Sequence, residues 1–252
     1  MQLRNSKMGT FKCQPFSIAF HHTHRLSRHS GIPGPEVSNT QNLSMLVVTM
    51  LGESSLSGVS KESDAIKYSF AGFSSVTVDT LERPTVDHVL QILPGYSIAH
   101  FASHGVSSKN LANSHLLLLK ESTLHDTESS SHDSLYTKEV DMLRVKDIAA
   151  LNLPVARLAY LSACSTTNSA SLYLIDEVTH IVSSFHIAGF PHVIGTLWPT
   201  EDEACEKMAA DFYSAFSKTD DVALSYRNAV LGLMKQKPLQ PMYWAPFVHF
   251  GA

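Results

Sequence analysis

The sequence contains few cysteines, no long apolar run and no excess of positive charge. Its three cysteines, Cys13, Cys164 and Cys205, are an odd number without paired spacing. This argues against a disulfide scaffold and favours a reducing compartment, the cytoplasm by default with the nucleus as an alternative. No apolar run reaches the roughly 18–20 residues that span a bilayer, and FSIAF near the N-terminus is too short for a signal-peptide core. The formal net charge of -4 gives no reason to expect a nucleic acid or a membrane surface as partner.

Glycine-rich phosphate-binding motifs are also missing. The nearest approach is LVVTMLGESSLSG after the first apolar run, and it matches neither the G-x-G-x-x-G nor the Walker pattern. Nucleotide binding is therefore the weakest of the three functions that we consider. No residue pattern calls for a cofactor.

What the sequence does contain is typical of a globular protein, with 44% hydrophobic and 17% charged residues. Residues 1–42 differ from the rest, because they lack periodicity and hold five basic residues against one acidic residue. The remaining 210 residues hold 14 basic and 22 acidic side chains, a charge of -8. We expect 1–42 to be a flexible tail and 43–252 to be the folded domain. The tail histidines His21, His22 and His24 could bind a metal, but no other ligand has a matching spacing, and we predict no metal site.

Apolar and β-branched runs alternate with helical patterns from residue 43 onward. The runs predict strands at 43–51, 74–81, 96–104, 114–120, 155–163 and 192–198. Helical spacing predicts helices at 84–93, 144–153, 176–190, 201–216 and 221–236. The polar, serine-rich residues 121–138 predict a surface loop. Alternation of this kind is typical of an α/β fold with a mostly parallel central sheet and helices on both faces.

Two of the predicted strands end on residues capable of covalent chemistry, His104 and Cys164. Catalytic groups of open α/β sheets gather at the carboxyl ends of the strands. A thiolate is a strong nucleophile, and a nearby imidazole lowers its pKa and carries the proton. The alternative is structural, with a cysteine that packs as a small apolar residue and a histidine that satisfies a local carbonyl.

Small neighbours would keep such a site open. Gly105 allows a sharp turn, so its N–H and that of Cys164 could form an oxyanion hole. Ser103 and Ser162 are short side chains beside the pair. His100 would share a face with His104, and we interpret it as a core or pocket-wall histidine.

Four blocks carry a resemblance to a known family: AHFASHG, LAYLSACST, AGFPHVIGTLWPTEDEA and WAPFVHFGA. In this order they resemble the CHAT domain, a caspase-like peptidase domain related to separase and often attached to tetratricopeptide repeats. The resemblance runs from about residue 43 to the C-terminus. It implies a caspase-like three-layer α/β sandwich and a cysteine endopeptidase that acts on a protein or peptide substrate.

The resemblance also implies roles for individual residues. His104 would be the general base, Cys164 the nucleophile, and the backbone N–H groups of Gly105 and Cys164 the oxyanion donors. Asp202, between Glu201 and Glu203, resembles the acidic residue of separases that selects a basic side chain; otherwise these acids are charges of a first helical turn. Ser162 stands where metacaspase-like relatives have a pocket aspartate, so their acidic pocket does not carry over.

The sequence departs from the family because residues 1–42 hold no tetratricopeptide repeat pattern, so we expect either a fragment of a longer repeat-bearing protein or a stand-alone form of the domain. A regulatory repeat protein could therefore act on it in trans. The same departure motivates a second function, a non-catalytic module for interaction or signalling that keeps the fold. Activity that depends on His104 and Cys164 discriminates between the two.

Overall fold

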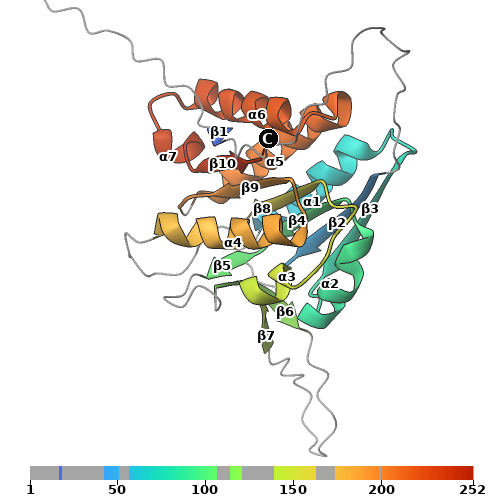
Figure 1. Cartoon of the computed structure of the whole chain (residues 1–252). Helices are drawn as coiled ribbons and strands as arrows, with labels where there is room; N and C mark the ends of the chain where they lie inside the picture. The colour runs from blue at the N-terminus through green and yellow to red at the C-terminus, as the bar shows by residue number, and fades with distance from the viewer. Residues whose placement is uncertain are drawn as a thin grey trace, which may run out of the picture.

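The computed structural model of the chain describes residues 17–18, 43–50, 57–106, 114–120, 139–162, 174–198 and 200–251. A seven-stranded sheet lies at the centre of the molecule (Figure 1). Its strands, in spatial order, are β1 (Ser17–Ile18), β10 (Phe247–Phe250), β9 (His192–Thr196), β8 (Leu158–Ser162), β4 (Ile98–Ala102), β2 (Leu43–Thr49) and β3 (Val76–Glu82). The five strands from β9 to β3 are parallel, and β10 runs antiparallel to β9. The predicted mostly parallel sheet is confirmed.

Helices cover both faces of this sheet, as the alternating pattern predicted (Figure 1). One face packs against α1 (Ser57–Phe70), α5 (Asp202–Thr219), α6 (Val222–Gln236) and α7 (Pro241–Trp244). The other packs against α2 (Val86–Ile92) with the 3-10 turn η1 (Leu93–Gly95), α3 (Val145–Ala149) and α4 (Leu174–Ala188). Side chains of one strand alternate between the two cores; on β2, Met45 and Val47 face α1 and α5, whereas Leu46 and Val48 face α2.

A small second sheet follows β4 directly. It is antiparallel, in the order β5 (His104–Val106), β6 (His115–Lys120) and β7 (Glu139–Arg144). Leu116 and Leu118 of β6 are buried in the core beneath α2 and α4. Asp141 of β7 accepts a 2.8 Å hydrogen bond from the N–H of Val86, in the first turn of α2. The chain thus leaves the central sheet at the end of β4 and returns to it at β8.

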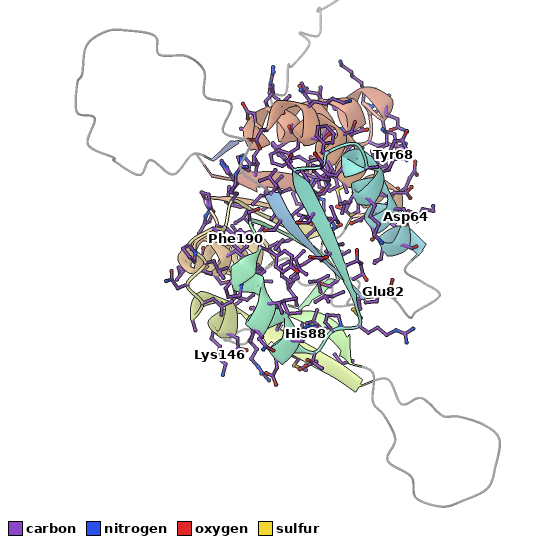
Figure 2. The ribbon with its side chains drawn as sticks, turned by 90° about the vertical axis from the view of Figure 1, so that its right-hand side faces the viewer. Asp64, Tyr68, Glu82, His88, Lys146 and Phe190 are labelled. Carbon is purple, nitrogen blue, oxygen red and sulfur yellow. The ribbon has the colours of Figure 1, made fainter. Side chains whose placement is uncertain are left out.

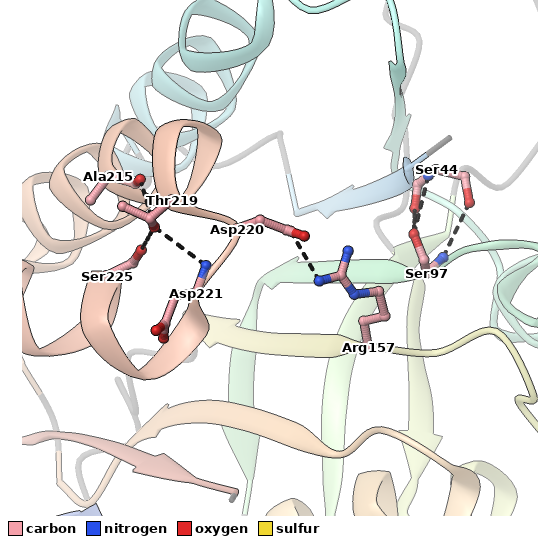
Figure 3. A network of polar contacts seen from close by, with 8 residues as sticks. All are labelled: Ser44, Ser97, Arg157, Ala215, Thr219, Asp220, Asp221 and Ser225. Carbon is pink, nitrogen blue, oxygen red and sulfur yellow. Dashed lines mark hydrogen bonds and ion pairs between the residues drawn. The ribbon is translucent and has the colours of Figure 1, made fainter. Parts of the chain in front are cut away.

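The amino edge of the sheet is held by polar contacts (Figure 3). Ser44 and Ser97 exchange backbone and hydroxyl hydrogen bonds between the starts of β2 and β4. Arg157, just before β8, donates to Asp220 at 2.9 Å after the end of α5. These contacts fix the strands at the edge opposite the predicted site.

The helix α4 ends at a glycine that the geometry requires. Gly189 has a φ of +126°, and a Cβ at this position would lie 2.7 Å from the carbonyl oxygen of Leu153. Its N–H bonds to the carbonyl of Phe185, which closes the last turn of the helix. The chain can then turn sharply into β9.

Every predicted strand and helix has a counterpart, with ends displaced by a few residues. Six strands and helices were not predicted: β1, β5, α1, β7, α7 and β10. The predicted loop 121–138 and the tail histidines lie outside the described residues. Ser17–Ile18 pair in parallel with His249–Phe250, and the predicted domain boundary at residue 43 stays a prediction. No helix in the described ranges is long and apolar enough to cross a membrane.

Candidate functional site

The two strands that lead to His104 and Cys164 are neighbours in the sheet. β4 and β8 pair in parallel over five positions, and the last aligned pair is Ala102 with Ser162. His104 and Cys164 each follow this pair by two residues. The two strands are therefore direct neighbours, and both end at the carboxyl edge of the sheet.

The structure describes only part of the predicted dyad. His104 begins β5, where its backbone lies opposite Leu117 of β6. Gly105 is the next residue of this strand and lies opposite Leu116. Cys164 lies outside the described residues. The catalytic roles of His104 and Cys164, and the oxyanion donors Gly105 and Cys164, stay predictions.

Ser162 lies at the end of β8 and is bound to a carboxylate from another element. Its side chain is buried, and its hydroxyl donates to Oε1 of Glu62 at 2.8 Å. Glu62 belongs to α1 and is itself only 3% exposed. A carboxylate from α1 therefore contacts residue 162, although residue 162 itself is a serine. The predicted pocket role of Ser162 stays a prediction.

His100 lies on β4 and completes the same polar cluster. Its ring is fully buried, with Nε2 at 3.1 Å from Oε2 of Glu62 and Nδ1 at 3.1 Å from the hydroxyl of Tyr213 on α5. The ring of Tyr160 on β8 stacks on the imidazole at 4.8 Å between centroids. The interpretation of His100 as a core histidine is confirmed.

Burial and the charge of Glu62 act together on Tyr213. Desolvation raises the pKa of this buried phenol well above its ordinary value, and the Glu62 carboxylate raises it further. The hydroxyl of Tyr213 therefore stays protonated and can donate to His100. Because a carboxylate only accepts hydrogen bonds, His100 and Ser162 both donate to Glu62.

Asp202 is the first residue of α5 and is exposed. Its Cβ lies against α1, where a Cβ added to Gly58 would come within 3.2 Å of it. Gly58 and Glu62 are one helical turn apart, so Asp202 and Ser162 both contact the same side of α1. The neighbouring Glu203 is bound to Lys237 and Tyr243. Both interpretations of Asp202, helix charge and specificity residue, stay open.

Sequence reasoning missed Glu62 and Tyr213. The one signal for Glu62 is its place on a helical face with Val59, Ile66 and Phe70, all of which are buried. Tyr213 carried no signal beyond its place among the aromatic residues of α5. Within the described ranges, no group of three His, Cys, Asp or Glu side chains is placed to hold a metal ion.

The fold is similar to that of a solved cysteine proteinase. The structure of gingipain R, an Arg specific cysteine proteinase, aligns over 84% of this chain and 47% of its own, with a TM-score of 0.51 and 10% identity. The Saccharomyces cerevisiae separase–securin complex aligns over 84% of this chain and 12% of the matched chain, with a TM-score of 0.48 and 16% identity. This chain thus spans less than half of either relative.

The likeness to gingipain R shows the fold, which is the caspase-like α/β sandwich that the sequence predicted. A search among curated proteins found no match. The family model of the CHAT domain matches residues 14–252, which include the whole central sheet. The chain belongs to the CHAT domain family.

Proposed function

We propose that this domain is a cysteine endopeptidase with His104 as general base and Cys164 as nucleophile. The observation that carries the proposal is the parallel pairing of β4 and β8, whose last aligned pair precedes both residues by two positions. Membership of the CHAT domain family supports it. The substrate would be a protein or peptide, and a regulatory repeat protein in trans would be a second partner.

The proposed reaction uses the side chains of His104 and Cys164, two backbone N–H groups and a water molecule. His104 takes the proton of Cys164, and the thiolate attacks the carbonyl carbon of the peptide bond. The N–H groups of Gly105 and Cys164 stabilise the oxyanion. The protonated His104 then gives its proton to the leaving amine, and a water activated by His104 hydrolyses the acyl-enzyme.

Asp202 is our candidate for substrate selection. It is exposed at the start of α5, and it packs against the side of α1 that also bonds Ser162. A carboxylate there would favour a basic residue before the cleaved bond. The Arg specificity in the name of gingipain R agrees with this assignment at the level of fold analogy. Ser162 would line the base of the same pocket.

The first test is covalent labelling of the purified chain with a peptide acyloxymethyl ketone that carries arginine before the reactive group. We expect the label on Cys164, with complete loss in Cys164→Ala and His104→Ala. Cys205→Ala is the matched control, because Cys205 is buried in α5 and its loss should leave labelling unchanged. A fully folded protein that is never labelled would refute the peptidase function and favour the non-catalytic module.

The second test concerns specificity. Asp202→Asn should lower kcat/KM for the arginine substrate about tenfold, the loss expected for one charge-assisted hydrogen bond. Asp211→Asn is the control on the same helix, where Asp211 pairs with Lys207 at 2.6 Å. Equal effects of the two substitutions would show that Asp202 is only a helix charge.

A further inference from the structure

The carboxylate of Glu62 touches the two strands that lead to the proposed dyad. Its Oε1 accepts from Ser162 of β8 at 2.8 Å, and its Oε2 lies 3.1 Å from Nε2 of His100 on β4. The side chain comes from α1, which packs on that face of the sheet. One carboxylate therefore bridges two adjacent strands near their carboxyl ends.

A second helix, α5, contacts the opposite side of the His100 ring. Tyr213 of α5 donates to Nδ1 of His100, so the hydrogen bonds run in one direction from Tyr213 through His100 to Glu62. Tyr160 of β8 stacks on the His100 ring. Both oxygens of Glu62 and both nitrogens of His100 have partners. The conformation of the cluster is thereby fixed from α1, α5, β4 and β8.

Stability alone does not explain a carboxylate in this core. Removing a charge from water is costly, and apolar residues of similar volume often replace buried polar pairs without loss of stability. The position of the cluster offers a reason. Ser162 precedes Cys164 by two residues in the sequence, and His100 precedes His104 by four.

We propose that Glu62 is a positioning residue of the peptidase site, which fixes the ends of β4 and β8 through His100 and Ser162 so that His104 and Cys164 meet. This assignment rests on the proposed function. Glu62 itself touches neither substrate nor the reacting atoms. It acts through Ser162, two residues before the nucleophile, and through His100, four residues before the base.

The experiment measures the pH dependence of alkylation of the whole chain by iodoacetamide, with the label on each cysteine quantified by mass spectrometry. An assembled dyad gives Cys164 an alkylation midpoint below the ordinary thiol value of about 8.5. Glu62→Ala and Ser162→Ala should move this midpoint upward by about one pH unit, so that Cys164 reacts about tenfold more slowly below it. Tyr213→Phe should shift it in the same direction.

The Glu62→Gln variant tests whether Glu62 acts through its hydrogen bonds or through its negative charge. Its amide oxygen can accept from Ser162 while its NH₂ donates to His100, whose other nitrogen then donates to Tyr213. We therefore expect the wild-type midpoint in Glu62→Gln. Tyr226→Phe is the matched control, because Tyr226 is also buried in this core and donates to the carbonyl of Phe247 at 2.8 Å. It should leave the midpoint unchanged.

Each other outcome overturns the assignment in a different way. An unchanged midpoint in folded Glu62→Ala and Ser162→Ala would show that the cluster does not position Cys164. A shift in Glu62→Gln as large as in Glu62→Ala would assign the effect to charge. A shift in Tyr226→Phe as large as in Tyr213→Phe would assign it to general loosening of the core. An ordinary midpoint in the wild type would refute the proposed function and this inference with it.

Discussion

A pair of stacked histidines at the amino edge of the sheet should make folding stability depend on pH. Nε2 of His249 lies 3.1 Å from Nδ1 of His192, and the two rings stack at 5.2 Å. His249 is 2% exposed, and its Nδ1 has no hydrogen-bond partner among the described residues. Burial lowers the pKa of His249 to about 4, with further lowering by His192 and His186 against an opposing effect of Asp221.

The direction of this pH dependence follows from the number of protons that the folded and unfolded states bind. In the unfolded chain the His249 imidazole has its ordinary pKa of about 6.5, so between that value and about 4 the unfolded state binds more protons. The contribution of neutral His249 to the free energy of unfolding is therefore fully present above about pH 6.5 and decreases as the pH falls through this window. The two pKa values give a loss of about 2 kcal/mol between about pH 7.5 and about pH 5.

Urea unfolding at both pH values measures this loss. His249→Phe keeps an aromatic ring of similar size but cannot take up a proton, so its stability should fall by about 2 kcal/mol less than that of the wild type. Tyr226→Phe is the control beside the same ring, because burial raises the pKa of Tyr226 and it does not titrate in this range. An identical pH dependence in the wild type and His249→Phe would refute the reasoning.

Two further predictions concern the backbone and the amino edge. Gly189→Ala should lower the free energy of unfolding by about 2 kcal/mol or more, because its positive φ and the nearby Leu153 carbonyl exclude a Cβ. Gly72→Ala is the control, since no heavy atom lies within 4 Å of the added Cβ. Equal stability of the two variants would contradict this prediction. The exposed pair Arg157–Asp220 should show a coupling of about 0.2–1 kcal/mol in a double-mutant cycle measured by urea unfolding; a coupling of several kcal/mol would contradict this.

The alternation of strands and helices could be predicted from the sequence because the parallel strands are buried on both faces. β4 and β8 are fully buried along their whole length, so they appear as continuous apolar runs. The order of the strands is less local, because β4 and β8 are neighbours across an excursion of more than 50 residues. No strand order was predicted from the sequence for this reason.

The helix α1 could not be predicted for a reason that bears on function. Its buried face includes Glu62 and Ser63 beside Val59 and Ile66, so the apolar stripe that marks a helix is interrupted by polar residues. Its outward face carries Asp64 and Tyr68, both exposed (Figure 2). The partner of Glu62 lies 100 positions away at Ser162, and no local pattern connects the two.

The strands β7 and β10 were missed because their patterns are weak. β7 reads EVDMLR, in which Val140 and Met142 are exposed and Leu143 is buried, so alternation is short and partly inverted. β10 has only four residues and is buried throughout. Its antiparallel pairing with β9 depends on a contact between distant segments.

The excursion between β4 and β8 has a consequence for how the chain can be altered. The small sheet β5–β6–β7 and α3 lie within it, while the register of β4 against β8 is set inside the central sheet. We therefore expect an insertion between Lys120 and Glu139, the facing ends of β6 and β7, to leave that register unchanged. Such an insertion would place a sensor within the sequence between the two halves of the proposed dyad and leave the sheet beneath them intact.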